Sequence, residues 1–340
     1  GFSQAIAPHT NQEFWGVDSD VGAFRDFVQR YVTVNGRQAS PKFLYGESYG
    51  APRTGVLANL LEVAGVRLTG VVLQSAIMNY NSNCGVLDPG TVSCAGYIPT
   101  YAAVSAYHQL SFPVPTDFTT YIQQALAFTS SQYAPAVSNY LVSHAPAPPS
   151  VLSQLTSFTG LSSAQWSANF DMGPDSYRAI VLPGRMIGRY DGRVNAASGT
   201  ALTADGDPSL TLINATFVDT VRSYITGQLR YSAGSTYAAS TDIINRWNFS
   251  HDGRSIPDTI PDLAAALTIN PAMKVVAMGG YYDLATPFHQ TELDMARLGV
   301  NPNIQVLNFG GGHMSYLDDT ARRAQRVTML ALYNSESVAP

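Results

Sequence analysis

The stretch Pro41-Lys42-Phe43-Leu44-Tyr45-Gly46-Glu47-Ser48-Tyr49-Gly50 decides the fold. Residues 41–45 have the apolar character of a short buried strand, and a helical leucine spacing continues beyond the glycines as far as Gly65. A strand, a sharp glycine turn and a helix therefore follow one another. The pattern Gly46-x-Ser48-x-Gly50 fits a nucleophile elbow, a strained turn whose small flanking residues let the serine hydroxyl project from the top of a sheet.

Apolar patterns elsewhere predict the remaining elements of an α/β fold. The run at 70–73 indicates a buried strand of the kind found in parallel sheets, and strand-like runs return at 273–278 and 304–309. A helix capped by Ser19 or Asp20 is predicted to end near Asn35-Gly36. Its apolar face consists of Val21, Phe24, Val28, Tyr31 and Val32.

The middle of the chain has a different pattern from both ends. Between about 97 and 261, helical spacings predominate and are broken by proline-rich joints. We therefore expect a mostly parallel sheet with helices on both faces, formed by residues 1–96 and 262–340. A helical cap at 97–261 is expected to interrupt this core.

Composition excludes several classes of partner. Apolar residues make up 45% of the 340 residues, so a sizeable core can be buried. Charged residues contribute 13%, and 24 acids against 19 bases give a net charge of −5. Neither nucleic acid nor a membrane surface is expected as a partner, because basic residues are not concentrated anywhere. No apolar run approaches the ~20 residues that span a bilayer.

The two cysteines, Cys84 and Cys94, lie in a segment rich in Gly, Asn and Pro. A disulfide between them is plausible and would contribute roughly 2–3 kcal/mol by restricting the unfolded chain. It would also imply an oxidising compartment, so we expect a secreted or periplasmic protein. Two unpaired thiols are the alternative. The cysteine spacing does not fit a zinc site, and no metal or cofactor is implied.

A serine nucleophile needs a neighbouring base, usually a histidine that a carboxylate orients. His313 follows the predicted strand at 304–309 and a run of glycines, and Asp283 follows the strand at 273–278 in the same way. Because parallel strands end at one edge of a sheet, Ser48, Asp283 and His313 are expected to meet there. The remaining histidines are expected at the surface or in packing roles: His9, His108, His144, His251 and His289.

Other interpretations of the acidic residue stay open. Taken alone, Asp283 is more often a residue that stabilises its own turn. Asp294 and Asp318 are rival partners for the histidine, but they fall in helix-like or trailing segments.

The sequence resembles the serine carboxypeptidase family of α/β-hydrolases. The resemblance rests on 46–50 (Gly-Glu-Ser-Tyr-Gly), Gly1-Phe2-Ser3, 280–283 (Gly-Tyr-Tyr-Asp) and Gly312-His313-Met314. The segments 188–193 and 281–287 are more similar to bacterial members. The order of the three candidate residues along the chain is also that of α/β-hydrolases.

The resemblance implies a role for each candidate residue. Ser48 would be the nucleophile, His313 the general base and then acid, and Asp283 its orienting partner. The amide of Tyr49 would donate to the oxyanion. Glu47 would bind the free carboxylate of a peptide's C-terminal residue by sharing a proton with it, so binding should weaken as the pH rises. The alternative is that Glu47 only hydrogen bonds the elbow.

The sequence also departs from the family. Relatives have an Asn-Gly-Gly-Pro-Gly segment, nearer the N-terminus, that supplies the second oxyanion donor, and this chain does not contain it. We therefore expect a fragment of a longer hydrolase, without the first strands of the sheet. The remainder would be absent or on another chain, and the fragment alone would be inactive and poorly folded.

These observations favour a carboxypeptidase that acts on the C-termini of peptides or proteins. An esterase or acyltransferase with the same three residues is one alternative, and a catalytically silent binding protein is another. Aromatic residues of the middle block could line a specificity pocket, although a core position is the more common outcome. They are Tyr97, Tyr101, Trp166 and Tyr190.

Overall fold

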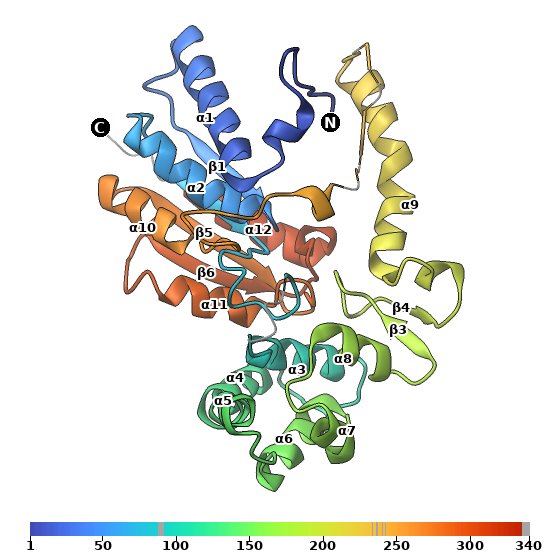
Figure 1. Ribbon diagram of the computed structural model, residues 1–340. Helices are drawn as coiled ribbons and strands as arrows, with labels where there is room; N and C mark the ends of the chain where they lie inside the picture. Colours follow the sequence, from blue (N-terminus) through green and yellow to red (C-terminus); the bar gives the residue numbers. More distant parts are fainter. Residues whose placement is uncertain (88–91, 233, 236, 240, 242, 335–340) are drawn as a thin grey trace.

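The computed structural model of the chain describes residues 1–87, 92–232, 234–235, 237–239, 241 and 243–334. Within these residues, four strands form one parallel sheet (Figure 1). Their order is β1 (Phe43–Glu47), β2 (Gly70–Gln74), β5 (Lys274–Gly280) and β6 (Ile304–Phe309). The strand predicted at 304–309 is confirmed, and the others lie close to their predicted ranges. The expected α/β organisation with a parallel sheet is therefore present.

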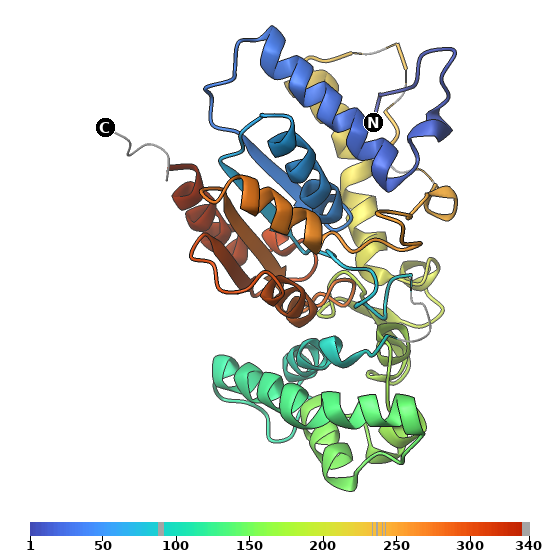
Figure 2. The same ribbon diagram turned by 60° about the vertical axis from the view of Figure 1, so that its left-hand side comes forward.

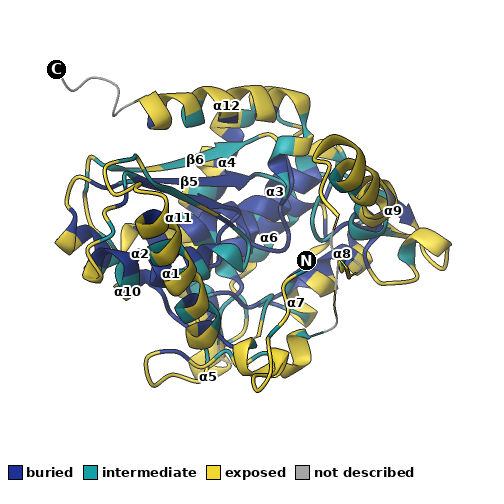
Figure 3. Cartoon of the chain, turned by 90° about the horizontal axis from the view of Figure 1, so that it is seen from above, coloured by how far each residue is buried: buried dark blue, intermediate teal, exposed yellow. Residues whose placement is uncertain are grey.

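Helices cover both faces of this sheet. They are α1 (Val17–Val34), α2 (Gly50–Val63), α10 (Ile260–Ile269), α11 (Phe288–Ala296) and α12 (Asp319–Asn334). Seen from above, α12 lies on one side of the sheet and the other four lie on the opposite side (Figure 3). Along β2, Val71 and Leu73 join the core with α2 and α10, whereas Val72 faces Leu332 of α12. Burial on both faces explains the continuous apolar runs in the sequence.

The middle of the chain forms a second group of helices with its own core. They are α3 (Ile98–Tyr107), α4 (Phe118–Phe128), α5 (Ala134–Ser143), α6 (Pro149–Thr159), α7 (Ser163–Ala168) and α8 (Pro174–Ile180). These helices gather below the sheet in Figure 2. Three of the four aromatic residues weighed as pocket residues, Tyr97, Tyr101 and Trp166, are buried in this core.

The chain returns from this block to the sheet through a hairpin and a long helix. The hairpin pairs β3 (Arg185–Ile187) with β4 (Asn195–Ala197), and α9 (Pro208–Ser223) follows. Residues 247–259 then differ from the helical pattern expected there, because they contain no helix and consist of isolated β-bridges and a tight turn at 252–253. Tyr80 and Thr259 donate backbone hydrogen bonds to Pro257 and Met78, and these bonds attach the segment to the end of β2.

The start of α1 also differs from the prediction. The helix begins at Val17, with Gly16 as its N-cap, rather than after Ser19 or Asp20. Backbone hydrogen bonds between Asn248 and residues 15 and 17 fix the chain here and let the helix begin earlier. Of the predicted apolar face, Phe24 and Tyr31 remain 41% and 54% exposed.

The predicted disulfide between Cys84 and Cys94 is confirmed, with a Cα–Cα distance of 5.3 Å. Both cysteines are buried against the core of the middle helices. Among the described residues, no helix is both long enough and apolar enough to cross a lipid bilayer.

Candidate active site

Ser48 lies in a strained turn between β1 and α2. Its φ of 56° is in the left-handed region, which residues other than glycine rarely adopt. Its amide donates to the carbonyl of Gln74 at 3.0 Å, so the turn is fixed to the end of the neighbouring strand. The amide of Tyr49, the N-cap of α2, has no hydrogen-bond partner among the described residues. It is therefore available to a ligand.

The two glycines of the elbow are not equivalent. A Cβ atom at Gly46 would lie 2.0 Å from the carbonyl oxygen of Gly50 and 2.3 Å from the Thr54 hydroxyl. Apart from the adjacent residues and the backbone of its own helix, no atom lies within 4 Å of a Cβ atom placed at Gly50. The pattern predicts a need for small residues on both sides of Ser48, whereas the structure requires glycine only at position 46. The turn is tight there because the start of α2 passes directly over β1.

Asp283 and His313 form a buried pair at the same edge of the sheet. The Nδ1 atom of His313 lies 2.8 Å from Oδ2 of Asp283, and the two side chains are 3% and 0% exposed. The other oxygen of Asp283 accepts the amides of Ala285 and Thr286 at 2.8 and 2.9 Å. Both interpretations of Asp283 therefore hold, because one oxygen stabilises its turn and the other binds the histidine.

The surroundings of His313 raise its pKa. Burial lowers the pKa, but the charge of Asp283 and its hydrogen bond outweigh this effect. Glu47 raises the pKa further and Arg189 opposes it. The net result is that the imidazolium form persists to a higher pH than in an exposed histidine.

Glu47 lies beside Ser48 in sequence and is linked to the histidine turn. The hydroxyl of Tyr316, three residues after His313, donates to Oε2 of Glu47 at 2.9 Å. Burial raises the pKa of Glu47, while the hydrogen bond from Tyr316 and the charge of His313 lower it in part. A half-buried carboxyl group that can hold a proton thus lies next to the strained serine.

No hydrogen bond joins the hydroxyl of Ser48 to His313 in the described part of the chain. The contact between Glu47 and Tyr316 nevertheless brings the two turns together. A hydrogen bond between a catalytic serine and its histidine is often long before substrate binds. The site therefore consists of an assembled acid and histidine pair, with the serine on an adjoining turn.

The other acids and histidines considered for the site have partners of their own. Asp294 accepts hydrogen bonds from Ser82 and Gln290, and Asp318 pairs with Arg193 at 3.0 Å. Three of the other histidines are bound to acidic side chains other than Asp283: His9 to Glu13, His251 to Asp18 and Asp262, and His289 to Glu292. His108 binds the carbonyl of Gly192, and His144 caps the end of α5. Asp283 is thus the acid that binds His313.

Sequence reasoning missed several contacts around His313. The carbonyl of Tyr190 accepts the amide of His313 at 2.6 Å, and its ring lies edge-on to the imidazole, 4.9 Å between centroids. The Thr286 hydroxyl lies 2.8 Å from Oδ2 of Asp283 and 3.1 Å from Nδ1 of His313. Tyr190, Thr286 and Tyr316 all lie within or close to the segments 188–193, 281–287 and 312–314, whose sequence patterns are the signal that could have singled them out.

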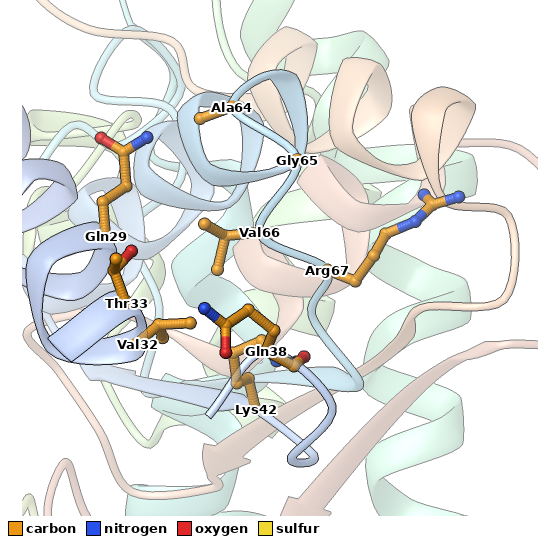
Figure 4. A pocket seen from close by; sticks show the side chains of 9 residues that line it. All are labelled: Gln29, Val32, Thr33, Gln38, Lys42, Ala64, Gly65, Val66 and Arg67. Carbon is orange, nitrogen blue, oxygen red and sulfur yellow. Dashed lines mark hydrogen bonds between the residues drawn. The ribbon is translucent and has the colours of Figure 1, made fainter. Parts of the chain in front are cut away.

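A cavity of about 240 Å³ lies elsewhere, between the end of α2 and the segment that leads into β1 (Figure 4). It is at the amino ends of the strands, whereas Ser48 follows the carboxyl end of β1. The ammonium group of Lys42, which lines it, already donates to the carbonyls of Arg37, Gln38 and Ser40. Within the described residues, no cluster of three or more His, Cys, Asp or Glu side chains could hold a metal ion.

Comparison with known proteins adds little. No family model matches the chain, and no curated protein matches it. The crystal structure of VinJ is similar over 98% of this chain and 77% of its own, with 16% sequence identity and a TM-score of 0.32. We infer nothing about function from so weak a likeness.

Proposed function

We propose that the protein is a serine carboxypeptidase with an α/β-hydrolase fold. The observation that carries this proposal is the buried contact between Asp283 and His313, at the sheet edge where the strained Ser48 also lies. A carboxylate that holds Nδ1 of a histidine leaves Nε2 free to act as a base. At the ends of parallel strands, this arrangement is the one that α/β-hydrolases use for acyl transfer.

In the proposed reaction, Nε2 of His313 accepts the proton of the Ser48 hydroxyl while Oγ attacks the carbonyl carbon of the last peptide bond. The amide of Tyr49 donates to the oxyanion that forms. The C–N bond then breaks, and His313 returns the proton to the leaving amino group. Water hydrolyses the acyl-enzyme by the same route, with His313 again accepting and donating one proton.

Glu47 supplies the preference for a free C-terminus. A carboxyl group whose pKa is raised by burial can remain protonated and share its proton with the carboxylate of the substrate. Its neighbour Tyr316 already donates to one oxygen, so the other oxygen is left for the substrate. An esterase would have no need of such a group beside the nucleophile.

Two ionisations then set the pH dependence. Binding weakens as the pH rises through the raised pKa of Glu47, because two carboxylates repel one another. Acylation weakens as the pH falls through the raised pKa of His313, because an imidazolium cannot accept a proton. We expect a bell-shaped profile with its maximum at weakly acidic pH.

The test compares a peptide with the same peptide amidated at its C-terminus. A carboxypeptidase releases the last residue of the free peptide and cleaves the amide far more slowly. An esterase or acyltransferase of this fold would instead react with simple esters, and its rate would be similar whether or not the ester substrate carries a free carboxylate. Binding of both peptides without turnover would support a catalytically silent protein instead.

The proposed location follows from the disulfide. A disulfide between Cys84 and Cys94 persists in oxidising compartments and is rare in the cytosol. We propose that the protein is secreted or periplasmic, where free peptide C-termini are the substrates.

A further inference from the structure

Ser75 is the residue directly after β2, the strand between β1 and β5. It is 1% exposed, and its φ of 46° lies in the left-handed region. Such a conformation is unfavourable for a residue with a side chain and persists only where the surrounding contacts hold it. A serine in this conformation therefore points to contacts that use its side chain.

The contacts of Ser75 reach two of the three turns of the candidate site. Its hydroxyl donates to the carbonyl of His313 at 2.5 Å, and its own carbonyl accepts the Thr286 hydroxyl at 2.9 Å. Thr286 in turn contacts both Asp283 and His313. Ser75, directly after β2, is thus attached both to the turn of Asp283 and to the turn of His313.

Gln74, the residue before Ser75, contacts the third turn of the site, that of Ser48. The carbonyl of Gln74 accepts the amide of Ser48, and the Gln74 side-chain amide donates to the hydroxyls of Ser75 and Ser315 at 3.0 and 3.1 Å. Gln74 is fully buried. The dipeptide Gln74-Ser75 therefore links the turns of Ser48, Asp283 and His313, which are far apart in sequence.

We propose that Ser75 is a positioning residue, whose hydroxyl holds the His313 turn in register with Asp283 and Ser48. This inference rests on the proposed function. Removing the hydroxyl leaves the buried carbonyl of His313 without its donor and lets the turn shift. A displacement of about 1 Å at a reacting group can reduce a rate by about a hundredfold.

The experiment measures how fast a fluorophosphonate labels Ser48, and it follows the titration of His313 by NMR in the same samples. The variants are Ser75→Ala and Ser75→Gly. Glycine adopts a φ of 46° without strain and keeps the carbonyl acceptor, so it removes the hydroxyl alone. The matched control is Ser105→Ala, since Ser105 is a fully buried serine that donates to the carbonyl of Thr159 at 2.8 Å, within the core of the middle helices.

We expect both Ser75 variants to label about ten- to a hundredfold more slowly than the wild type, with Ser105→Ala changed by less than about twofold. The pKa of His313 should fall towards its ordinary value in both, because the histidine aligns less well with Asp283. Glu47 and Arg189 are the other charged groups that act on His313, and they are unchanged.

Folded Ser75→Gly protein that labels at the wild-type rate, with an unchanged His313 titration, would overturn the positioning role. Should Ser75→Ala fail to fold, the glycine variant alone decides. A wild-type protein that does not label at Ser48 would instead refute the proposed function. The His313 titration would then decide the positioning role by itself.

Discussion

Gly46 is the residue on which the nucleophile turn depends most. We expect Gly46→Ala to destabilise the protein by about 3 kcal/mol, because the new Cβ atom would overlap the backbone of Gly50. The backbone there cannot move far enough to remove this overlap. Urea denaturation measures the change. Gly50→Ala is the matched control and should alter the free energy of unfolding by no more than about 1 kcal/mol, since a Cβ atom there meets open space. Equal stability of the two variants would contradict the geometry of this turn.

Glu47 is the residue that ties substrate binding to pH. In the wild type, KM for a peptide should rise by up to about tenfold per pH unit above the pKa of Glu47. Glu47→Gln should flatten this rise, because a glutamine carries no proton that titrates. It should also lower the pKa of His313, since the charge of Glu47 helps to raise that pKa.

The control for this variant is Glu292→Gln. Glu292 is also half-buried and binds a histidine, His289, at 2.9 Å, but it lies on α11 and has no contact with Ser48 or His313 among the described residues. Its replacement should leave the slope of KM against pH unchanged. A wild-type slope retained in Glu47→Gln would contradict the shared proton.

At the scale of elements, the predictions succeeded where local pattern and tertiary burial agree. Strands buried on both faces, such as β2 and β5, give short apolar runs that end in recognisable residues. The positions of Ser48, Asp283 and His313 after strands could therefore be predicted from the sequence. The start of α1 could not, because Asn248 fixes it from a distant segment. Ser75 was missed for the same reason, since its role lies in contacts with turns far along the chain.

The loop closed by Cys84 and Cys94 is an element whose stability can be tested directly. Replacing both cysteines by serine should lower the free energy of unfolding by about 2–3 kcal/mol, because the unfolded chain is no longer restricted. Thermal denaturation with and without a reducing agent provides the comparison. Reduced wild type should match the variant, and the variant itself should not respond to the reductant. A wild type that does not respond to complete reduction would contradict this role.

Considered as a whole, the molecule should lose stability as the pH rises from acidic towards neutral values. Burial raises the pKa of Asp294 from 3.8 to about 6, so the folded protein keeps a proton there that the unfolded chain releases. The free energy of unfolding therefore falls, by up to about 3 kcal/mol, as the pH rises between 3.8 and about 6. His313 and His251 also have raised pKa values. Their contribution is fully present below pH 6.5 and is lost as the pH rises through their folded pKa values.

Asp294→Asn isolates the first of these effects. The variant should lose the decline in stability between pH 3.8 and about 6 and should be more stable than the wild type at pH 7. Denaturation at a series of pH values measures this. Asp319→Asn, at an exposed carboxylate, is the control and should follow the wild type. Parallel curves for Asp294→Asn and the wild type would show that Asp294 is ionised in the folded protein at acidic pH.

The central claim is that Ser48, Asp283 and His313 act together at one edge of the sheet. The most direct measurement is the rate at which a fluorophosphonate labels Ser48, located by mass spectrometry, in the wild type, His313→Gln and His289→Gln. His289 is a suitable control because it is also a buried histidine bound to a carboxylate. The missing second oxyanion donor leads us to expect an inactive chain, but losing one such donor slows acylation without abolishing it. We therefore predict labelling of Ser48 in the wild type and in His289→Gln, and a rate at least about a thousandfold lower in His313→Gln. Equal rates in the two histidine variants, or a folded wild type that is not labelled at Ser48, would contradict the account.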